Sequence, residues 1–265
     1  MRRWLCVYRA LLHMGWSSVL EYRAQIVIWM TNSLLMVTMM LVWLGVSSSG
    51  AVNGFSSADF IAYFIVGWVV RNLTAVWASW ELDYRIREGR LSPMLLRPLH
   101  PIHHDIAIHL AEKGLRALIV LPIAALVFWL TPDAPLRLDL FTLFAFSVSV
   151  FLAWLIKFMI DFLLGMLAFW ISQASAFFEV FYGLTLVLTG AIAPLSMFPE
   201  TIQSALQWSP FPYMLSFPTE IAIGRVYGEA LVFGFAMQGF WALVGTAAAF
   251  VMWKIALRSY TAVGA

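Results

Sequence analysis

The chain has 265 residues, of which 62% are hydrophobic and 11% are charged, with a formal net charge of +2. Soluble domains usually carry about 25% charged residues, so this composition excludes a water-soluble fold. Its 16 basic residues are spread through the joints between apolar runs, which fits membrane topology better than nucleic-acid binding. The single cysteine, Cys6, excludes an internal disulfide and a multi-cysteine metal site.

Residues 2–23 place apolar side chains at helical spacing beside basic ones. Tyr8 and Trp16 belong to the apolar set, and Arg9 and His13 to the polar set. This pattern predicts an amphipathic helix lying in the cytoplasmic interface of the membrane. The alternative is that the segment lengthens the first span. No signal peptide is expected, because charges interrupt the apolar stretch and no small-residue cleavage site follows.

Six apolar runs follow, each close to the roughly 20 residues that a helix needs to cross a bilayer. They cover residues 25–46, 59–80, 106–130, 139–160, 163–189 and 230–253. The sequence therefore predicts an all-α, polytopic membrane protein with about six transmembrane helices in a single domain over residues 1–265. The chain is expected to turn near residues 157–165 between the fourth and fifth runs.

The distribution of Lys and Arg predicts the orientation of these spans. With the N-terminus in the cytoplasm, 13 of the 16 basic residues fall on the cytoplasmic side, among them Lys113, Arg116 and Lys157. Such an excess is the usual mark of cytoplasmic loops. Both termini are therefore expected in the cytoplasm.

The predicted cytoplasmic segment 81–104 mixes charged and apolar residues and is punctuated by Gly89 and Pro98. Leu91 and Leu95 would give it a compact apolar surface rimmed by charge, as in surfaces that dock a soluble partner. The alternative is an ordinary loop with the positive bias of the cytoplasmic side.

The predicted outer segment 190–228 contains five of the 11 prolines and is too apolar for a solvated loop. We expect short helices that enter the outer leaflet and return, packed against other spans, because irregular backbone at that depth needs protein or water partners. The residues that mark this re-entrant hairpin are Pro194, Phe198, Pro199, Pro210 and Tyr213.

Two charged residues, Arg71 and Glu179, lie near the middle of predicted spans, where a charge costs about 2.5–3.5 kcal/mol on insertion scales. They could pair with each other, line the substrate path or contact a companion subunit. Lys157 and Asp161 are four residues apart, which predicts a local salt bridge. No metal site is expected at His100 and its neighbouring histidines, because suitable additional ligands are missing nearby.

The chain resembles the permease subunit of an ABC transporter of the ABC-2 (type-2 exporter) family over nearly its whole length. Residues 88–91, with the sequence Glu-Gly-Arg-Leu, and residues 95–99, Leu-Leu-Arg-Pro-Leu, look like the coupling segment of that family. Residues 190–194, 198–199 and 210–213 are similar to its outer re-entrant hairpin. The coupling sequences look closest to bacterial permeases that work with a second, related permease.

The resemblance implies an ATP-driven exporter in the bacterial cytoplasmic (inner) membrane, with a path formed by this chain and a second permease. Separate ABC ATPase subunits would bind ATP and Mg²⁺, since the sequence contains no Gly-x-x-x-x-Gly-Lys-Ser/Thr phosphate loop. The chain itself is therefore expected to be neither an enzyme nor a cofactor-binding protein. The implied ATPase contacts are Glu88, Gly89, Arg90, Leu91, Leu95, Arg97 and Pro98.

The main alternative is an ATPase-independent secondary transporter or channel, which could use Arg71 and Glu179 for ion coupling. No inverted repeat is evident, however, and the coupling-like loop would have no purpose. An intramembrane enzyme is disfavoured because no triad or paired-carboxylate spacing emerges. A path between apolar spans would suit amphipathic substrates such as lipids, glycolipids, peptides or hydrophobic drugs.

Overall fold

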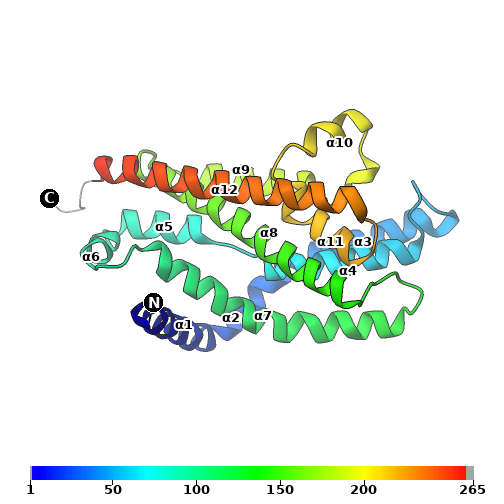
Figure 1. The fold of residues 1–265 in the computed structure, drawn as a ribbon, viewed down its shortest axis with the longest axis horizontal. Coiled ribbons are helices and arrows are strands. Elements are labelled where there is room, and N and C mark those ends of the chain that lie inside the picture. Colours follow the sequence, from blue (N-terminus) through cyan, green and yellow to red (C-terminus); the bar gives the residue numbers. More distant parts are fainter. Residues whose placement is uncertain (1, 261–265) are drawn as a thin grey trace.

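The computed structural model describes the backbone of residues 2–260 and, outside residues 2–5 and 32, their side chains. Within this part of the chain every regular element is a helix (Figure 1). Five helical segments are long and apolar enough to cross a membrane: Arg23–Ser49, Ser57–Arg87, Ile102–Leu130, Leu140–Phe169 and Gly228–Ser259. The prediction of an all-α, polytopic membrane protein is confirmed.

The N-terminal helix α1 (Arg2–Glu21) packs along the first half of α7 (Ile102–Leu130). The Tyr8 hydroxyl lies 2.5 Å from Nδ1 of His103, and the Trp16 ring lies against Gly114. The earlier residue of α1 contacts the earlier residue of α7, and the later contacts the later, so the two helices run in the same direction. A helix is therefore present where the sequence predicts one, and its position in the membrane interface stays a prediction.

The first span consists of α2 (Arg23–Met30), a 3-10 turn η1 (Thr31–Leu34), α3 (Leu35–Val46) and η2 (Ser47–Ser49). The second begins with α4 (Ser57–Leu73), where Ser56 and Asp59 form a reciprocal capping box. Such a box satisfies two of the backbone N–H groups that a helix start leaves free. Most of α4 is buried, and α3, α7 and α11 pack against it.

The second span continues as α5 (Ala78–Arg87) and leads through a short α6 (Leu91–Leu95) into α7. Helix α7 contains Pro122 in its interior. Helix α8 (Leu140–Met166) extends through the region where a turn was expected, and η3 (Leu167–Phe169) continues it. The predicted turn at residues 157–165 is therefore wrong.

Close packing explains why α8 continues. A Cβ atom on Gly165 would lie 2.9 Å from the Cα of Ser79, so the glycine lets α8 approach α5. The chain reverses after Trp170 and forms α9 (Ser175–Leu188), a helix of 14 residues. At 1.5 Å per residue α9 is about 21 Å long, shorter than the roughly 30 Å hydrocarbon core, so the fifth predicted span is split.

Short helices fill the segment between α9 and the last span, as the sequence predicts. They are η4 (Leu195–Met197), α10 (Glu200–Leu206), η5 (Pro212–Met214) and α11 (Ser216–Ala222), followed by the long α12 (Gly228–Ser259). Both η5 and α11 are buried against α8, whereas α10 projects from the body of the molecule (Figure 1).

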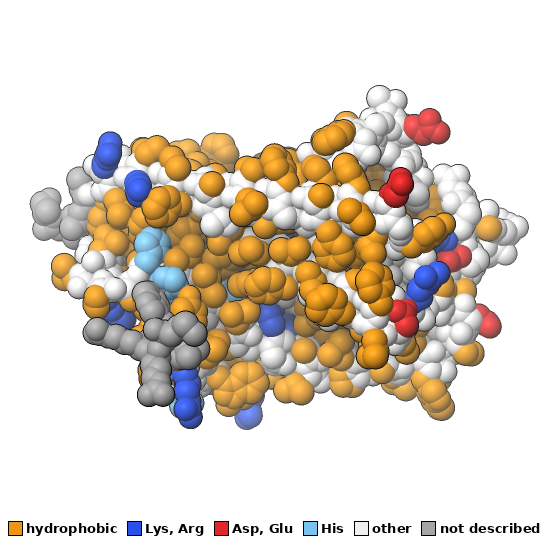
Figure 2. All heavy atoms as spheres, viewed as in Figure 1, with side chains coloured by type: hydrophobic (Ala, Val, Ile, Leu, Met, Phe, Trp, Pro, Cys, Tyr) orange, Lys and Arg blue, Asp and Glu red, His pale blue; other side chains and the backbone are white. Residues whose placement is uncertain are grey.

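The molecule has two distinct ends. Figure 1 places α6 and both chain ends at one of them, which we call the α6 end, and α10 at the other, the α10 end. Hydrophobic side chains cover most of the face in Figure 2, and the visible charged groups lie mainly towards its margins. Exposed apolar residues of the long helices include Trp129, Val232 and Leu243. This distribution suits a molecule surrounded by lipid.

Candidate functional site

The second span is interrupted between α4 and α5, where residues 74–77 are not helical. No glycine or proline lies between Gly67 and Gly89, so local sequence alone does not explain this break. An interruption within a membrane span leaves backbone groups without helical partners, and other parts of the protein must bind them. Charged side chains of α7 and α8 fill this role.

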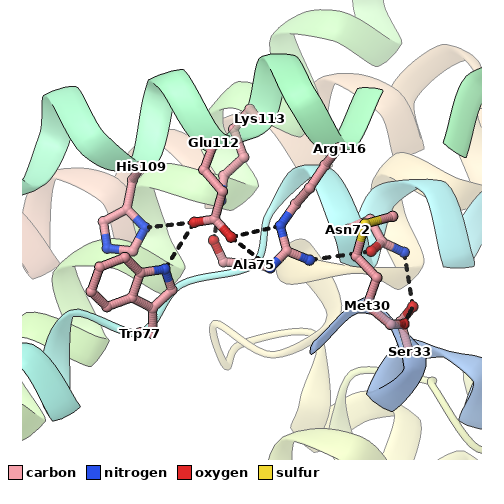
Figure 3. Close-up of polar contacts among 9 residues, drawn as sticks. All are labelled: Met30, Ser33, Asn72, Ala75, Trp77, His109, Glu112, Lys113 and Arg116. Atoms are coloured by element: carbon pink, nitrogen blue, oxygen red, sulfur yellow. Dashed lines mark hydrogen bonds and ion pairs between the residues drawn. The ribbon is translucent and has the colours of Figure 1, made fainter. Parts of the chain in front are cut away.

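On the α7 side, three side chains within little more than one helical turn contribute polar groups to the break (Figure 3). Glu112 Oε2 accepts a 2.8 Å hydrogen bond from the Trp77 indole N–H. The Lys113 amine donates to the Ala75 carbonyl. Arg116 donates to Glu112 Oε1 at 2.6 and 2.8 Å, which forms a buried ion pair.

The same polar contacts extend from α7 to the first span. Arg116 donates to Asn72 Oδ1 at 3.3 Å, and the Asn72 amide donates to Ser33 Oγ at 3.1 Å (Figure 3). The Trp68 indole also donates to Ser33, at 2.9 Å. These buried contacts connect α7, the end of α4 and η1, so a displacement of one changes the partners of the others.

On the α8 side, Asp161 binds the start of α5. Its carboxylate accepts from the Ser79 backbone N–H at 2.8 Å, from the Ser79 hydroxyl at 3.0 Å and from the Tyr182 hydroxyl at 2.5 Å. A carboxylate near a helix N-terminus also interacts favourably with the helix dipole. Lys157 donates to Thr74 Oγ1 at 2.7 Å, on the other side of the break.

The structure corrects one prediction here. Lys157 and Asp161 make no ion pair with each other in the described part of the chain, because each binds a different side of the break. Lys113, Arg116 and Lys157 lie inside α7 and α8 and not in loops. The count of Lys and Arg on each side of the membrane takes no account of what such residues contact. In the structure these three side chains bind the interrupted helix.

Arg71 and Glu179 do not form an ion pair with each other. Arg71 lies in the last turn of α4 and makes no hydrogen bond or ion pair with a described residue. Glu179 lies exposed on α9. Of the roles open to Arg71, lining a cavity fits its position.

Two cavities meet at Arg71. The first, of about 290 Å³, extends from the break along α9 to η5, and the second, of about 580 Å³, lies between the break, η1 and α5. Residues shared by the two linings are Arg71, Ala75, Val76 and Tyr182. The interrupted helix therefore lies between two open cavities.

The segment around α6 combines a buried and an exposed side. Gly89 ends α5 with a φ of 68°, a left-handed conformation that glycine adopts readily. Leu91 is fully buried in this chain and Leu95 packs against the same cluster, whereas Leu96 is 89% exposed. The other predicted contact residues, Glu88, Arg90, Arg97 and Pro98, are exposed. Leu91 therefore anchors the segment internally, and the sequence analysis missed Leu96 as its exposed apolar residue.

At the α10 end, neutral groups bind the irregular backbone. The Tyr213 hydroxyl donates to the Gln207 carbonyl at 2.6 Å, and burial raises the pKa of Tyr213 to about 12, so the hydroxyl keeps its proton. The Gln238 amide donates to the carbonyls of Tyr213 and Ser149. Among the other predicted residues Pro194 is buried, Phe198 and Pro210 are partly buried and Pro199 is exposed.

A comparison with models of protein families identifies the family of this chain. The model of a family described as ABC-2 family transporter protein matches residues 28–264 of the chain. The chain belongs to this ABC-2 family. A comparison with curated proteins finds no match. The protein is therefore a transmembrane component of an ABC transporter and a multi-pass membrane protein, and its family associates with ABC ATPase partners.

For this ABC-2 protein the sequence analysis found Arg71 but missed the other charged residues at the break. Glu112 and Arg116 have the four-residue spacing of a helical ion pair. The sequence analysis missed this spacing because it used Arg116 only to predict the orientation of the spans. Asp161 was seen only as a partner for Lys157. Its binding to Ser79 joins residues far apart in sequence, which no local pattern indicates.

Proposed function

We propose that the chain and a second, related permease form the path of an ATP-driven exporter in the cytoplasmic membrane of a bacterium. Both termini and the α6 end face the cytoplasm. Separate ABC ATPase subunits, which hold ATP and Mg²⁺, bind at α6. The path follows the cavities beside the interrupted second span.

One observation carries the proposal: the α6 segment is held firmly from inside and presents a small apolar tip outside. Leu91 is buried against the inner cluster, and Leu96 is exposed next to Arg97. An exposed leucine with charged neighbours is the arrangement of an interface anchor and its rim. Its position at the end that carries both termini supports a cytoplasmic partner (Figure 1).

The connections of the α6 segment support coupling to the break. The segment joins α5 to α7, and both helices flank the interruption. Arg85 of α5 donates to Asp105 of α7 at 2.6 Å in a buried ion pair. A force applied to α6 by an ATPase therefore acts on two helices that are already fastened to each other and to residues 74–77.

Replacing Leu96 by Asp tests this docking surface. The matched control is Leu138→Asp. Leu138 is 67% exposed and lies in the loop before α8, away from α6. Burial of a leucine is worth about 1.5–3 kcal/mol, so Leu96→Asp should weaken ATPase binding by roughly tenfold or more. The measurement is the amount of ATPase that copurifies with each variant in mild detergent, with ATP hydrolysis as a second readout.

The result is valid only if the variant permease remains folded. Its elution volume in gel filtration and its melting temperature test this. An ATPase that stays bound to Leu96→Asp as firmly as to Leu138→Asp would contradict the proposed docking surface. A chain that purifies without any ATPase and moves solute in vesicles without ATP would instead be a secondary transporter or channel.

A further inference from the structure

Arg71 is a guanidinium in the membrane part of the protein without a counterion among the described residues. Arg116, also beside the break, is paired with Glu112, whereas Arg71 lines both cavities and donates to no described acceptor. A charged side chain within a bilayer usually faces a cavity or a partner group. The position of Arg71 therefore calls for an anion that enters the cavity.

Further basic groups lie around Arg71. Besides the Glu112–Arg116 and Glu81–Arg85 ion pairs, the break carries Lys113 and Lys157 against the carboxylate of Asp161. Lys113 and Lys157 donate to neutral oxygens. Basic groups therefore outnumber carboxylates at the break among the described residues.

The smaller cavity is polar near the break and apolar towards η5. Its polar lining at the break comes from Arg71, Thr74, Lys157, Asp161 and Tyr182. Its lining along α9 and η5 is mainly apolar, from Phe181, Leu186, Met214 and Leu215, with the two hydroxyls of Thr185 and Thr189 among them. Its volume of about 290 Å³ lies at the lower limit of small-molecule pockets, which span roughly 300–1,000 Å³. A ligand that matches both parts has a charged head and an apolar tail.

We propose that this cavity binds an anionic amphiphile as the transported substrate. Its phosphate or carboxylate head contacts Arg71 and Lys157, and its tail lies between α9 and η5. A guanidinium suits such heads because it donates two parallel hydrogen bonds to two anionic oxygens. This inference rests on the proposed function and specifies the substrate class.

The test is saturable binding of radiolabelled dodecyl phosphate to the complex purified from its native membranes in phosphatidylcholine nanodiscs. Empty discs give the background, and ATPase content is measured on the same samples. Arg71→Gln should weaken binding by roughly tenfold or more, because it removes charge-assisted hydrogen bonds. Arg71→Lys should recover part of the affinity. Arg258→Gln, an equal charge change at an exposed residue of α12, should bind as the wild type does.

Competitors identify which part of the ligand is recognised. Dodecyl maltoside should displace the probe poorly, and inorganic phosphate should bind more weakly than dodecyl phosphate. Nanodiscs that contain phosphatidylglycerol, an anionic lipid, distinguish a bilayer lipid from a soluble amphiphile as the natural ligand. Weaker probe binding there would support the inference and identify a bilayer lipid as the ligand, while unchanged binding would support a soluble amphiphile.

Four results would overturn the inference. The first is equal binding to Arg71→Gln and to the wild type, and the second is equal displacement by dodecyl maltoside. The third is loss of the second permease from Arg71→Gln, which would show that a residue of that subunit neutralises Arg71. ATPase that remains bound while dodecyl phosphate fails to bind would refute the substrate class alone. A wild-type sample without ATPase would refute the proposed function.

Discussion

The two irregular regions of this protein, the break in the second span and the segment between α9 and α12, are stabilised by different chemistry. Glu112, Lys113, Lys157 and Asp161 bind the break with ionisable side chains. The backbone of the segment near α10 is bound by neutral groups, as in the hydrogen bonds from the Gln238 amide to carbonyls, and the Glu220 carboxylate of this segment accepts from the Ser216 side chain instead.

The difference indicates different roles. Neutral hydrogen bonds satisfy backbone groups without adding charge in a membrane, so they suit a region with a fixed structure. Ionisable groups are expensive at membrane depth and usually mark a functional site. The backbone partners of the break therefore agree with the transport role proposed for it above.

The largest effect is expected from Glu112→Ala. This change leaves Arg116 buried without its carboxylate and Trp77 without its acceptor, and breaking a buried ion pair costs about 3–5 kcal/mol. Glu112→Gln should be less harmful, because an amide oxygen still accepts from Trp77. Thermal unfolding of the purified variants, followed by tryptophan fluorescence, measures both. A wild-type melting temperature in Glu112→Ala would show that the break does not depend on this pair.

A smaller loss is expected from Gln238→Leu in the other region. The carbonyls of Tyr213 and Ser149 lose a donor, and a buried polar group without a partner costs about 1–3 kcal/mol. Gln25→Leu is the control, because Gln25 is exposed. The same unfolding assay applies. If Gln238→Leu were more destabilising than Glu112→Ala, the distinction between the two regions would fail.

The smallest effect is expected at Asp139, the exposed N-cap residue of α8. It shows what a carboxylate contributes outside the membrane-spanning helices. Its side chain accepts from the backbone N–H and hydroxyl of Thr142, and these hydrogen bonds lower its pKa. Because the folded pKa lies below the unfolded one, the stabilisation is present above about pH 4 and disappears as pH falls through the lowered value. The difference in melting temperature between the wild type and Asp139→Ala should therefore be smaller at about pH 3 than at about pH 7. An equal difference at both values would contradict this.

Much of the fold follows from the sequence because hydropathy reports directly on lipid exposure. The runs that become α4, α7, α8 and α12 are long and apolar, and the structure contains them. The end of α8 could not be predicted in the same way. Apolar residues continue from α8 into α9, so the reversal after Trp170 changes the composition little, and the packing of Gly165 on α5 is a tertiary contact.

The site is less predictable because side chains from distant segments create it. Arg71 stands out as a charge within an apolar run, and the Gly89 turn and α6 lie where the coupling segment was expected. The interruption at residues 74–77 carries no glycine or proline signal, since its backbone partners are on α7 and α8. The exposure of Leu96 and the burial of Leu91 likewise depend on how α6 packs, which spacing alone does not reveal.

The proline inside α7 has a consequence for how the two ends of the molecule can move independently. Pro122 has no N–H, so the Leu118 carbonyl loses its helical donor and the helix can bend there. The part of α7 before this point holds α1 and the break, and the part after it leads to the loop before α8. A hinge at Pro122 would allow the half of α7 that packs on α1 to swing while the other half keeps its place in the bundle.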